Sequence, residues 1–302
     1  MRPRHEWEHY FSDSTAKWRR AHLKNYILPA FGNRYLSTIT KKEVWNWLSS
    51  IKRLKQTRNH ILFTFRIPLR ETEEQELILF NPLEKVRHFV TKNKLVRDIF
   101  TSEDLKLLFP PSTSKLFAVW KNAKYASLFL IFATKGIRSG EARAVQWKHV
   151  LDNGWLIIEQ AVKSNGTIAD TKTRSDRLVF LPLRTHEALD LWRAESIFTE
   201  PEDFIFFGAD RNRPMNVTTA SKLLPKAIDR AGIERNGRNL VVHSFRHTFT
   251  TMMRRILPED ILRQFTGHKT LKMTELYDHP AIQDKMSKLK AAVPLIEQAW
   301  KK

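Results

Sequence analysis

Apolar and polar residues recur at helical spacing through the first part of the chain, and we expect four helices there. In the first helix, around residues 17–24, the basic residues share one face: Lys17, Arg20 and Lys24. The apolar residues share another face: Trp18, Ala21 and Leu28. Pro29 and Gly32 predict the end of this helix. Thr40, with Glu43 three positions later, has the capping-box spacing that opens a second helix.

The third predicted helix spans residues 56–66, and its apolar positions follow one face. Ile61 and Phe65 should face inward, whereas Arg58 should face outward. Pro68 is expected to interrupt this helix, because proline lacks the N–H that an interior helical position donates.

A fourth, short helix within residues 71–79 completes a small helical bundle, which we place at residues 1–92. Residues 91–97 are polar and basic, and we expect an interdomain linker at residues 93–97. The second domain then covers residues 98–302.

Helical spacing also dominates the second domain. Thr101, with Asp104 three positions later, predicts a helix cap at its start. A strongly apolar stretch, residues 118–133, predicts a long buried helix. Further helices are expected at residues 187–194, 218–230, 244–255 and 259–265.

Between these helices the pattern changes to that of β-strands. Strands are expected at residues 154–162 and 177–183, with a hairpin turn at Asn165-Gly166. The predicted fold class is therefore mainly α with a small antiparallel β-sheet (α+β).

The net charge of the chain indicates which classes of partner it binds. Lys and Arg total 52 against 32 Asp and Glu, which gives a net charge of +20. Such an excess favours a polyanion, either nucleic acid or an anionic membrane. No apolar run approaches the roughly 20 residues of a membrane span, and the N-terminus lacks a signal-type apolar core, so we expect nucleic acid and no membrane. The absence of cysteine excludes disulfides, thiolate catalysis and cysteine zinc sites, and it is compatible with a reducing cytoplasm.

His243 and Arg246 lie one turn apart at the start of a predicted helix, where both can reach one bound anion. The simpler interpretation is a capping or core histidine beside a solvated arginine. Zinc is a third interpretation, because His243 and His247 have the spacing of a metalloprotease helix. However, Ser244 stands where that chemistry needs a glutamate.

Arg138 lies between Gly136 and Gly140, directly after the apolar helix. The glycines allow a tight turn, and the planar guanidinium can hold two phosphate oxygens. A plain surface arginine at a helix start is the alternative. Glu141 can hold this loop or a neighbouring basic side chain in place.

Three further residues complete a set suited to phosphoryl transfer without a metal or other cofactor. Lys172, between the predicted strands, is by default a solvated lysine, but beside a scissile phosphate it could protonate the leaving oxygen. His268 follows Gly267, and Tyr277 comes nine positions later. A tyrosine is most often half-buried packing, but its hydroxyl can also attack phosphorus.

These motifs resemble the tyrosine recombinases of the phage integrase family. The matching elements are Gly136-Ile137-Arg138-Ser139-Gly140-Glu141, Lys172, His243-Ser244-Phe245-Arg246, Thr266-Gly267-His268 and Tyr277-Asp278-His279. Residues 27–40 and Asn81-Pro82 resemble the helical, SAM-like core-binding domain of the same family. The resemblance implies an N-terminal core-binding domain followed by a catalytic domain.

The resemblance also implies a role for each residue of the set. Tyr277 would attack the scissile phosphate and form a 3′-phosphotyrosyl link, with a free 5′-hydroxyl as the other product. Arg138 and Arg246 would stabilise the transition state, and Lys172 would protonate the leaving oxygen. His243 would assist deprotonation of the tyrosine. His268 would form a hydrogen bond to a non-bridging oxygen of the phosphate.

The same resemblance implies double-stranded DNA as substrate and a homotetramer on two duplexes, acting on a phage or mobile element in the cytoplasm at the nucleoid. It leaves room for host DNA-bending or directionality factors. The residues expected to contact DNA are Lys17, Arg20, Lys24, Arg58 and Arg174. The tail from about residue 286 includes an apolar stretch, residues 291–300, which would pack either on a neighbour or on its own core.

Many integrases carry an additional N-terminal arm-binding domain, for which residues 1–12 are too few. We therefore expect either a simple recombinase or a shortened chain. Three other functions stay open: a DNA-binding protein without strand exchange, a type IB topoisomerase-like enzyme, and a metal-dependent nuclease or DDE-type integrase. The last would use carboxylates such as Asp98, Glu103 and Asp104, which show no arrangement around a site.

Overall fold

The structure is a computed structural model that describes residues 13–90, 98–152, 154–163, 165–170 and 177–266, with residues 294 and 298. The chain divides into two compact units, Met1–Val96 (unit 1) and Arg97–Lys302 (unit 2). Each unit has its own hydrophobic core. The predicted linker at residues 93–97 lies outside the described residues.

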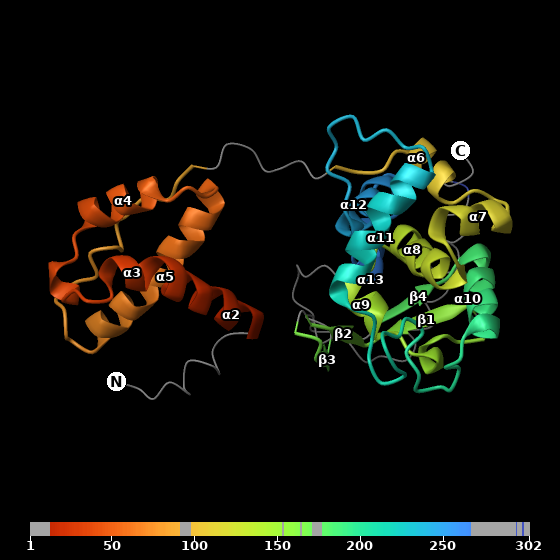
Figure 1. Cartoon of the computed structure of the whole chain (residues 1–302), viewed down its shortest axis with the longest axis horizontal. Helices are drawn as coiled ribbons and strands as arrows, with labels where there is room; N and C mark the ends of the chain where they lie inside the picture. Colours follow the sequence, from red (N-terminus) through yellow and green to blue (C-terminus); the bar gives the residue numbers. More distant parts are fainter. Residues whose placement is uncertain are drawn as a thin grey trace. The chain divides into compact units, whose positions relative to one another are not determined.

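Unit 1 is a bundle of helices, drawn in red to orange in Figure 1. Its core contains the fully buried side chains of Val44, Leu48, Ile61 and Leu62. Its elements are α2 (Asp13–His22), the π-helical turn η1 (Leu23–Ile27), α3 (Leu28–Phe31), the 3-10 turn η2 (Leu36–Thr38), α4 (Lys41–Ser50) and α5 (Lys55–Glu74).

The π-helical turn η1 changes which residues of the first helix face the core. A π turn holds more residues than an α turn, so it rotates every position that follows it. The sequence predicts Leu28 on the apolar face, but Leu28 is 57% exposed, while Ile27 and Phe31 are buried. The helix ends at Gly32, as predicted, because Gly32 is the C-cap of α3. Pro29 does not end it, because it lies in the first turn of α3, where its missing N–H is tolerated.

α5 runs through Pro68, so the predicted interruption and the separate helix within residues 71–79 are wrong. An interior proline costs about 3 kcal/mol of helix stability. Phe65 and Leu69 lie on either side of it, and both are buried in the core. Burial of each such side chain contributes roughly 1.5–3 kcal/mol, which offsets the proline.

Two predicted helix caps are confirmed. The Thr40 hydroxyl accepts a hydrogen bond from the backbone N of Glu43 at the start of α4. Thr101 and Asp104 form a reciprocal capping box at the start of α6 (Ser102–Leu108), with distances of 3.0 and 2.8 Å. Such caps satisfy backbone N–H groups that have no partner within the helix.

Unit 2 consists mainly of helices, with short antiparallel strands, which confirms the predicted fold class. Its helices after α6 are α7 (Thr113–Trp120), α8 (Ala123–Lys135), α9 (Ser139–Ala144), the 3-10 turn η3 (Trp147–His149), α10 (Leu183–Glu195), α11 (Val217–Arg230), α12 (Val242–Met253) and α13 (Glu259–Thr266).

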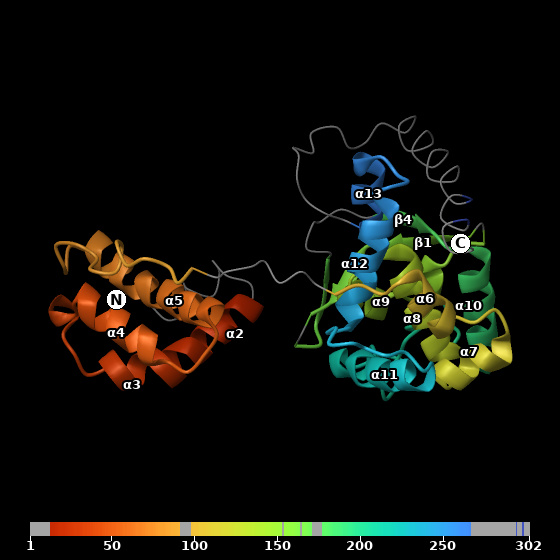
Figure 2. The same ribbon diagram turned by 90° about the horizontal axis from the view of Figure 1, so that it is seen from above.

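Helix α8 is the centre of unit 2. Eleven of its thirteen residues are buried, and α7, α9, α10 and α12 all contact it (Figures 1 and 2). The predicted helix over residues 118–133 is in fact two helices. Lys121 has a positive φ of 79°, and the Asn122 side chain accepts a hydrogen bond from the N of Tyr125, so α7 ends and α8 begins there.

The described part of unit 2 contains four strands, where the sequence predicts two. β1 (Trp155–Ile158) pairs with β4 (Arg177–Phe180), and β2 (Gln160–Val162) pairs with β3 (Ile168–Asp170), both antiparallel. The predicted turn at Asn165-Gly166 joins β2 to β3, with a φ of 89° at Gly166. The strand expected over residues 177–183 ends at Phe180, because α10 begins at Leu183.

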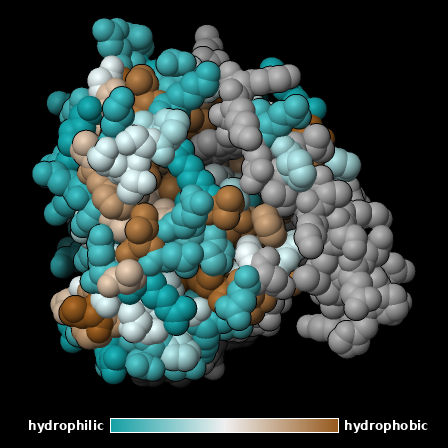
Figure 3. Space-filling model, turned by 90° about the vertical axis from the view of Figure 1, so that its right-hand side faces the viewer, coloured by the Kyte–Doolittle hydropathy of each residue, from teal (hydrophilic) through white to brown (hydrophobic). Residues whose placement is uncertain are grey.

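Among the coloured residues on the side shown in Figure 3, hydrophobic residues lie in small groups between hydrophilic ones. Within the described ranges, none of the helices combines the length and the apolar character needed to cross a membrane.

Gly136, which ends α8, should be sensitive to any side chain. Its φ is 57°, and an added Cβ would lie 2.7 Å from Cδ1 of Phe249 on α12. Gly136→Ala should therefore lower the free energy of unfolding by roughly 2–4 kcal/mol, from backbone strain and steric overlap together. Urea unfolding measures this loss.

Gly232→Ala is the matched control, because Gly232 has a similar φ of 68° but nothing within 4 Å of an added Cβ. It should lose only the strain component, about 1 kcal/mol. Equal losses in the two variants would show that α8 and α12 do not pack closely at Gly136.

Candidate active site

Arg138 lies at the junction of α8 and α9. Gly136 ends α8 in the left-handed conformation, and Arg138 is the residue that precedes α9. Its backbone N donates to Oε2 of Glu141 over 2.8 Å, and its Nη1 donates to Oε1 over 2.8 Å. Glu141 thus holds both the loop and the guanidinium, which confirms the role predicted for it.

Gly140 lets α9 approach β2 closely. A Cβ at this position would lie 2.7 Å from the carbonyl O of Val162, the last residue of β2. Only glycine fits here without movement of the backbone. The predicted role of the glycines around Arg138 in bringing this loop into a site is consistent with this packing.

Glu141 also binds a second arginine, which the sequence analysis did not single out. Nη2 of Arg177 donates to Oε2 over 2.6 Å, and Nη1 lies 3.4 Å from Oε1. The side chains of Arg177 and Glu141 are only 8% and 1% exposed. Nε of Arg177 donates to the backbone O of Phe265 over 3.2 Å, so the same side chain reaches the last turn of α13.

Arg246 is the third arginine of the group. It lies on α12 and is 3% exposed. Its Nη1 donates to the backbone O of Gly136 over 2.7 Å, and its Nη2 donates to the backbone O of Thr266. Arg246 therefore joins the end of α8 to the end of α13, where free carbonyls favour a cation.

The pKa values reflect the crowding of these charges. Burial lowers the pKa of Arg246 to about 10; the charge of Arg138 lowers it, Glu141 raises it, and Arg177 lowers it again. Burial alone would raise the pKa of Glu141, but the charge and hydrogen bonds of Arg177, together with the bonds from Arg138, bring it below its ordinary value. Both groups are charged at neutral pH.

We call Arg138, Glu141, Arg177 and Arg246 the arginine cluster. It contains three guanidinium groups and one carboxylate. This excess of positive charge, held largely away from water, suits a phosphate group, because the attraction between charges is stronger where water is excluded.

His243 lies on the first turn of α12 and is exposed, whereas Arg246 is buried one turn later. The rings of His243 and His247 are edge to face, 4.7 Å apart. Within the described ranges, no three metal-ligating side chains form a group around them or elsewhere.

The other predicted site residues lie outside the described residues: Lys172, Arg174, His268 and Tyr277. Two of them are close in the sequence to described residues. Lys172 precedes Arg177 by five positions, and His268 follows Thr266 by two. Arg177 and Thr266 are both part of, or bonded to, the arginine cluster.

Two carboxylates considered for a metal-dependent nuclease serve another purpose. Asp98 Oδ2 accepts from the backbone N of Asn239 over 2.6 Å. Asp104 binds both terminal nitrogens of Arg238, at 2.6 and 3.3 Å, in addition to capping α6. They hold the segment before α12 in place and do not converge on the arginine cluster.

The basic residues predicted to bind DNA in unit 1 differ in exposure. Lys17 and Arg20 on α2 and Lys24 on η1 are exposed, as expected. Arg58 is half-buried, with its Nε bonded to the backbone O of Arg53 and its guanidinium 5.4 Å from the centre of the Phe89 ring. Arg58 is therefore less exposed than the three other basic residues.

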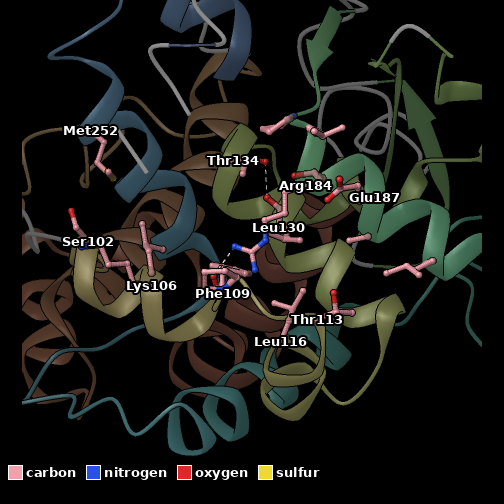
Figure 4. A pocket seen from close by; sticks show the side chains of 17 residues that line it. Ser102, Lys106, Phe109, Thr113, Leu116, Leu130, Thr134, Arg184, Glu187 and Met252 are labelled. Carbon is pink, nitrogen blue, oxygen red and sulfur yellow. Dashed lines mark hydrogen bonds between the residues drawn. The ribbon is translucent and has the colours of Figure 1, made fainter. Parts of the chain in front are cut away.

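Unit 2 also has an apolar cavity of about 720 Å³ between α6, α7, α8 and α10 (Figure 4). Arg184 from α10 crosses it and donates to the backbone O of Phe109 over 2.7 Å. None of the residues of the arginine cluster lines this cavity. We therefore assign the candidate chemistry to the cluster.

Comparison with known families matches both units. The sequence model of the phage integrase family matches residues 107–284. The chain belongs to the phage integrase family. A second model, the phage integrase N-terminal SAM-like domain, matches residues 5–52 in unit 1. These matches confirm the resemblance found in the sequence motifs.

Curated relatives carry names from the same family. A protein of Sinorhizobium fredii named as an integrase/recombinase is 29% identical over 156 residues, which are 50% of this chain and 34% of that protein. A tyrosine recombinase of Thermosipho africanus is 20% identical over 289 residues, 92% of this chain and 93% of that protein. The chain thus spans about a third of the Sinorhizobium protein but nearly all of the Thermosipho protein.

Solved structures share the fold. The Tn1549 transposon integrase in complex with a circular intermediate DNA gives a TM-score of 0.71 at 14% identity, over 95% of this chain and 96% of that one. A lambda integrase tetramer bound to a Holliday junction gives a TM-score of 0.65 at 17% identity, over 88% of this chain and 76% of that one.

Replacing the buried carboxylate should produce a pH-dependent loss of stability. The pKa of Glu141 is below its ordinary value of 4.5, so its contribution is fully present above about pH 4.5 and is lost as the pH falls through the lowered pKa. Glu141→Gln should lower the free energy of unfolding by roughly 3 kcal/mol at pH 7, because it leaves buried guanidiniums without their counter-charge.

Urea unfolding between pH 7 and pH 3 tests this, and the difference from the wild type should shrink only below about pH 4.5. Glu84→Gln is the control, because Glu84 pairs with Arg70 at the surface and is 56% exposed. It should change stability by less than about 1 kcal/mol. A difference for Glu141→Gln that stays constant down to pH 3 would contradict the assignment.

Proposed function

We propose that the chain is a site-specific tyrosine recombinase that cuts and rejoins double-stranded DNA through a 3′-phosphotyrosyl intermediate, and integrates or excises a phage or mobile element. The observation that carries the proposal is the arginine cluster. It brings Arg138 and Arg246, two residues of the family's motif, together with the buried carboxylate of Glu141 on α9. Family membership supports the same conclusion.

The proposed reaction exchanges one phosphodiester for another. The hydroxyl oxygen of Tyr277 attacks the scissile phosphorus, and the bond from phosphorus to the 5′-oxygen breaks. His243 assists removal of the tyrosine proton, and Lys172 gives a proton to the leaving 5′-oxygen. Religation reverses these steps with a 5′-hydroxyl as the attacking group.

Arg138 and Arg246 stabilise the charge that builds up on the non-bridging oxygens, and His268 donates to one of them. Preorganised cations of this kind are the largest single contribution in many enzymes. In other phosphoryl-transfer enzymes a metal ion supplies this stabilisation. The phosphotyrosyl link conserves the bond energy, so the proposal includes neither ATP nor a metal.

Unit 1 is proposed to be the core-binding domain that grips DNA beside the cleavage site. The exposed Lys17, Arg20 and Lys24 support this, as does the net charge of +20. The lambda integrase neighbour is a tetramer on a Holliday junction, and we propose a homotetramer on two duplexes for this chain. Lys172 and Arg174 would contact the same DNA as the arginine cluster. Host DNA-bending or directionality factors would be further partners. Because its substrate is DNA, the protein would act at the nucleoid.

Tyr277→Phe should abolish the covalent complex and leave DNA affinity within about twofold of the wild type, because one hydroxyl is lost from a large electrostatic interface. A suicide DNA substrate with a nick near the cleavage site traps the intermediate for gel analysis. Mass mapping then identifies the modified residue. A covalent adduct in Tyr277→Phe would show that another residue is the nucleophile.

The same substrate separates the other functions. DNA binding without any covalent complex in the wild type would support a DNA-binding protein. A covalent complex with relaxation of supercoils but no exchange between two duplexes would support a topoisomerase-like enzyme. Loss of cleavage in EDTA would support a metal-dependent nuclease.

Arg246→Gln should slow cleavage roughly 100- to 1,000-fold, because it removes a buried charge from the transition state. Binding to intact DNA, measured by a gel shift, should change by less than about threefold, since phosphate contacts elsewhere carry the affinity. Equal losses in binding and cleavage would make Arg246 a docking residue only.

A further inference from the structure

We propose that Arg177 is a positioning residue for the cleavage reaction, which keeps the charge and orientation of Arg138 available to the scissile phosphate. It acts through the carboxylate of Glu141, which both arginines share. This inference rests on the proposed function and adds a residue to its machinery.

Arg177 fixes the position of the Glu141 carboxylate. Arg177 approaches both oxygens of Glu141, at 2.6 and 3.4 Å, and so fixes the plane of the carboxylate. Arg138 uses the same two oxygens, one for its backbone N and one for Nη1. The orientation of the Arg138 guanidinium therefore depends on a carboxylate that Arg177 holds still.

Arg177 also neutralises the charge of Glu141. Glu141 is 1% exposed, so water contributes little to its neutralisation, and its neighbours must do so. Arg177 is 8% exposed and forms the shorter ion pair with Glu141, at 2.6 Å against 2.8 Å for Arg138. Because Arg177 neutralises Glu141, the positive charge of Arg138 can act on a phosphate. Without Arg177, Arg138 would be the main counter-charge of Glu141, and less of its charge would act on the phosphate.

The Arg177 side chain also reaches the last turn of α13. Its Nε donates to the backbone O of Phe265, and Arg246 donates to the backbone O of Thr266, the next residue. Two arginines thus donate hydrogen bonds to successive backbone carbonyls at the end of α13. Arg177 is also the first residue of β4, which follows the segment containing Lys172. One side chain therefore connects β4, α9 and α13.

The test compares two suicide substrates, one with an ordinary scissile phosphate and one with a methylphosphonate there. The methylphosphonate lacks the charge on one non-bridging oxygen, so its transition state depends less on Arg138. On the phosphate substrate, Arg177→Gln should cleave roughly 10- to 100-fold more slowly than the wild type, in the range typical of residues that orient a reacting group. On the methylphosphonate, the two proteins should differ by less than about threefold.

Arg184→Gln is the matched control. Arg184 is also partly buried and also donates to backbone carbonyls, those of Phe109 and Pro110, but it lies outside the arginine cluster. Its replacement should lower stability while the ratio of the two cleavage rates stays as in the wild type. Arg177→Lys, which keeps the charge but not the fork, should fall between Arg177→Gln and the wild type.

A second measurement tests whether Arg177 acts through Glu141. The double variant Glu141→Gln with Arg177→Gln removes both the carboxylate and its partner. If Arg177 acts only through Glu141, this variant should cleave the phosphate substrate no more slowly than Glu141→Gln alone. A loss equal to the product of the two single losses would show independent roles and overturn the proposal.

The remaining outcomes are also decisive. If Arg177→Gln slows cleavage of both substrates by the same factor, or of neither, Arg177 supports only the fold and the inference is wrong. If the wild type forms no covalent complex with the phosphate substrate, the proposed function fails and this inference fails with it. A gel shift with intact DNA separates both cases from a loss of binding.

Discussion

A carboxylate that is almost completely withdrawn from water needs compensating charge close by, and Glu141 has it from two arginines at once. This requirement organises the catalytic unit. Arg138 comes from the α8–α9 junction and Arg177 from β4, while Arg246 on α12 binds the backbone where α8 ends. Segments more than a hundred residues apart in the chain are thereby fixed around one negative charge.

The backbone near the cluster is shaped to permit this convergence. Gly136 turns the chain at the end of α8, and its carbonyl is free to accept from Arg246. Gly140 allows α9 to lie directly against β2. The end of α13 supplies two carbonyls to two arginines, which satisfies groups that a helix end leaves without partners. The cluster is a structural centre as well as a candidate for chemistry, because the same hydrogen bonds serve both.

The sequence was sufficient for the parts that depend on local chemistry. Thr40 and Thr101 were identifiable as caps from the residue three positions later, and Arg138 and Arg246 were identifiable from a motif. Arg177 was not, because it begins a run of strand-forming residues, and nothing in that run shows that its side chain turns towards a glutamate 36 positions earlier. The continuity of α5 through Pro68 was also beyond local rules, since packing of the core on both sides overrides the preference of the proline. Lys172, His268 and Tyr277 remain predictions from the motif.

The π-helical turn at Leu23–Ile27 has a further consequence for how relatives of this chain should vary. A π turn is an α-helix that has absorbed one additional amino acid. Removing one residue from this stretch would restore regular winding and rotate the preceding segment, including Lys17 and Arg20, by about 100° around the helix axis. Length differences of a single residue among homologues at this point would therefore redirect the basic face of the first helix while the buried Ile27 and Phe31 keep their places.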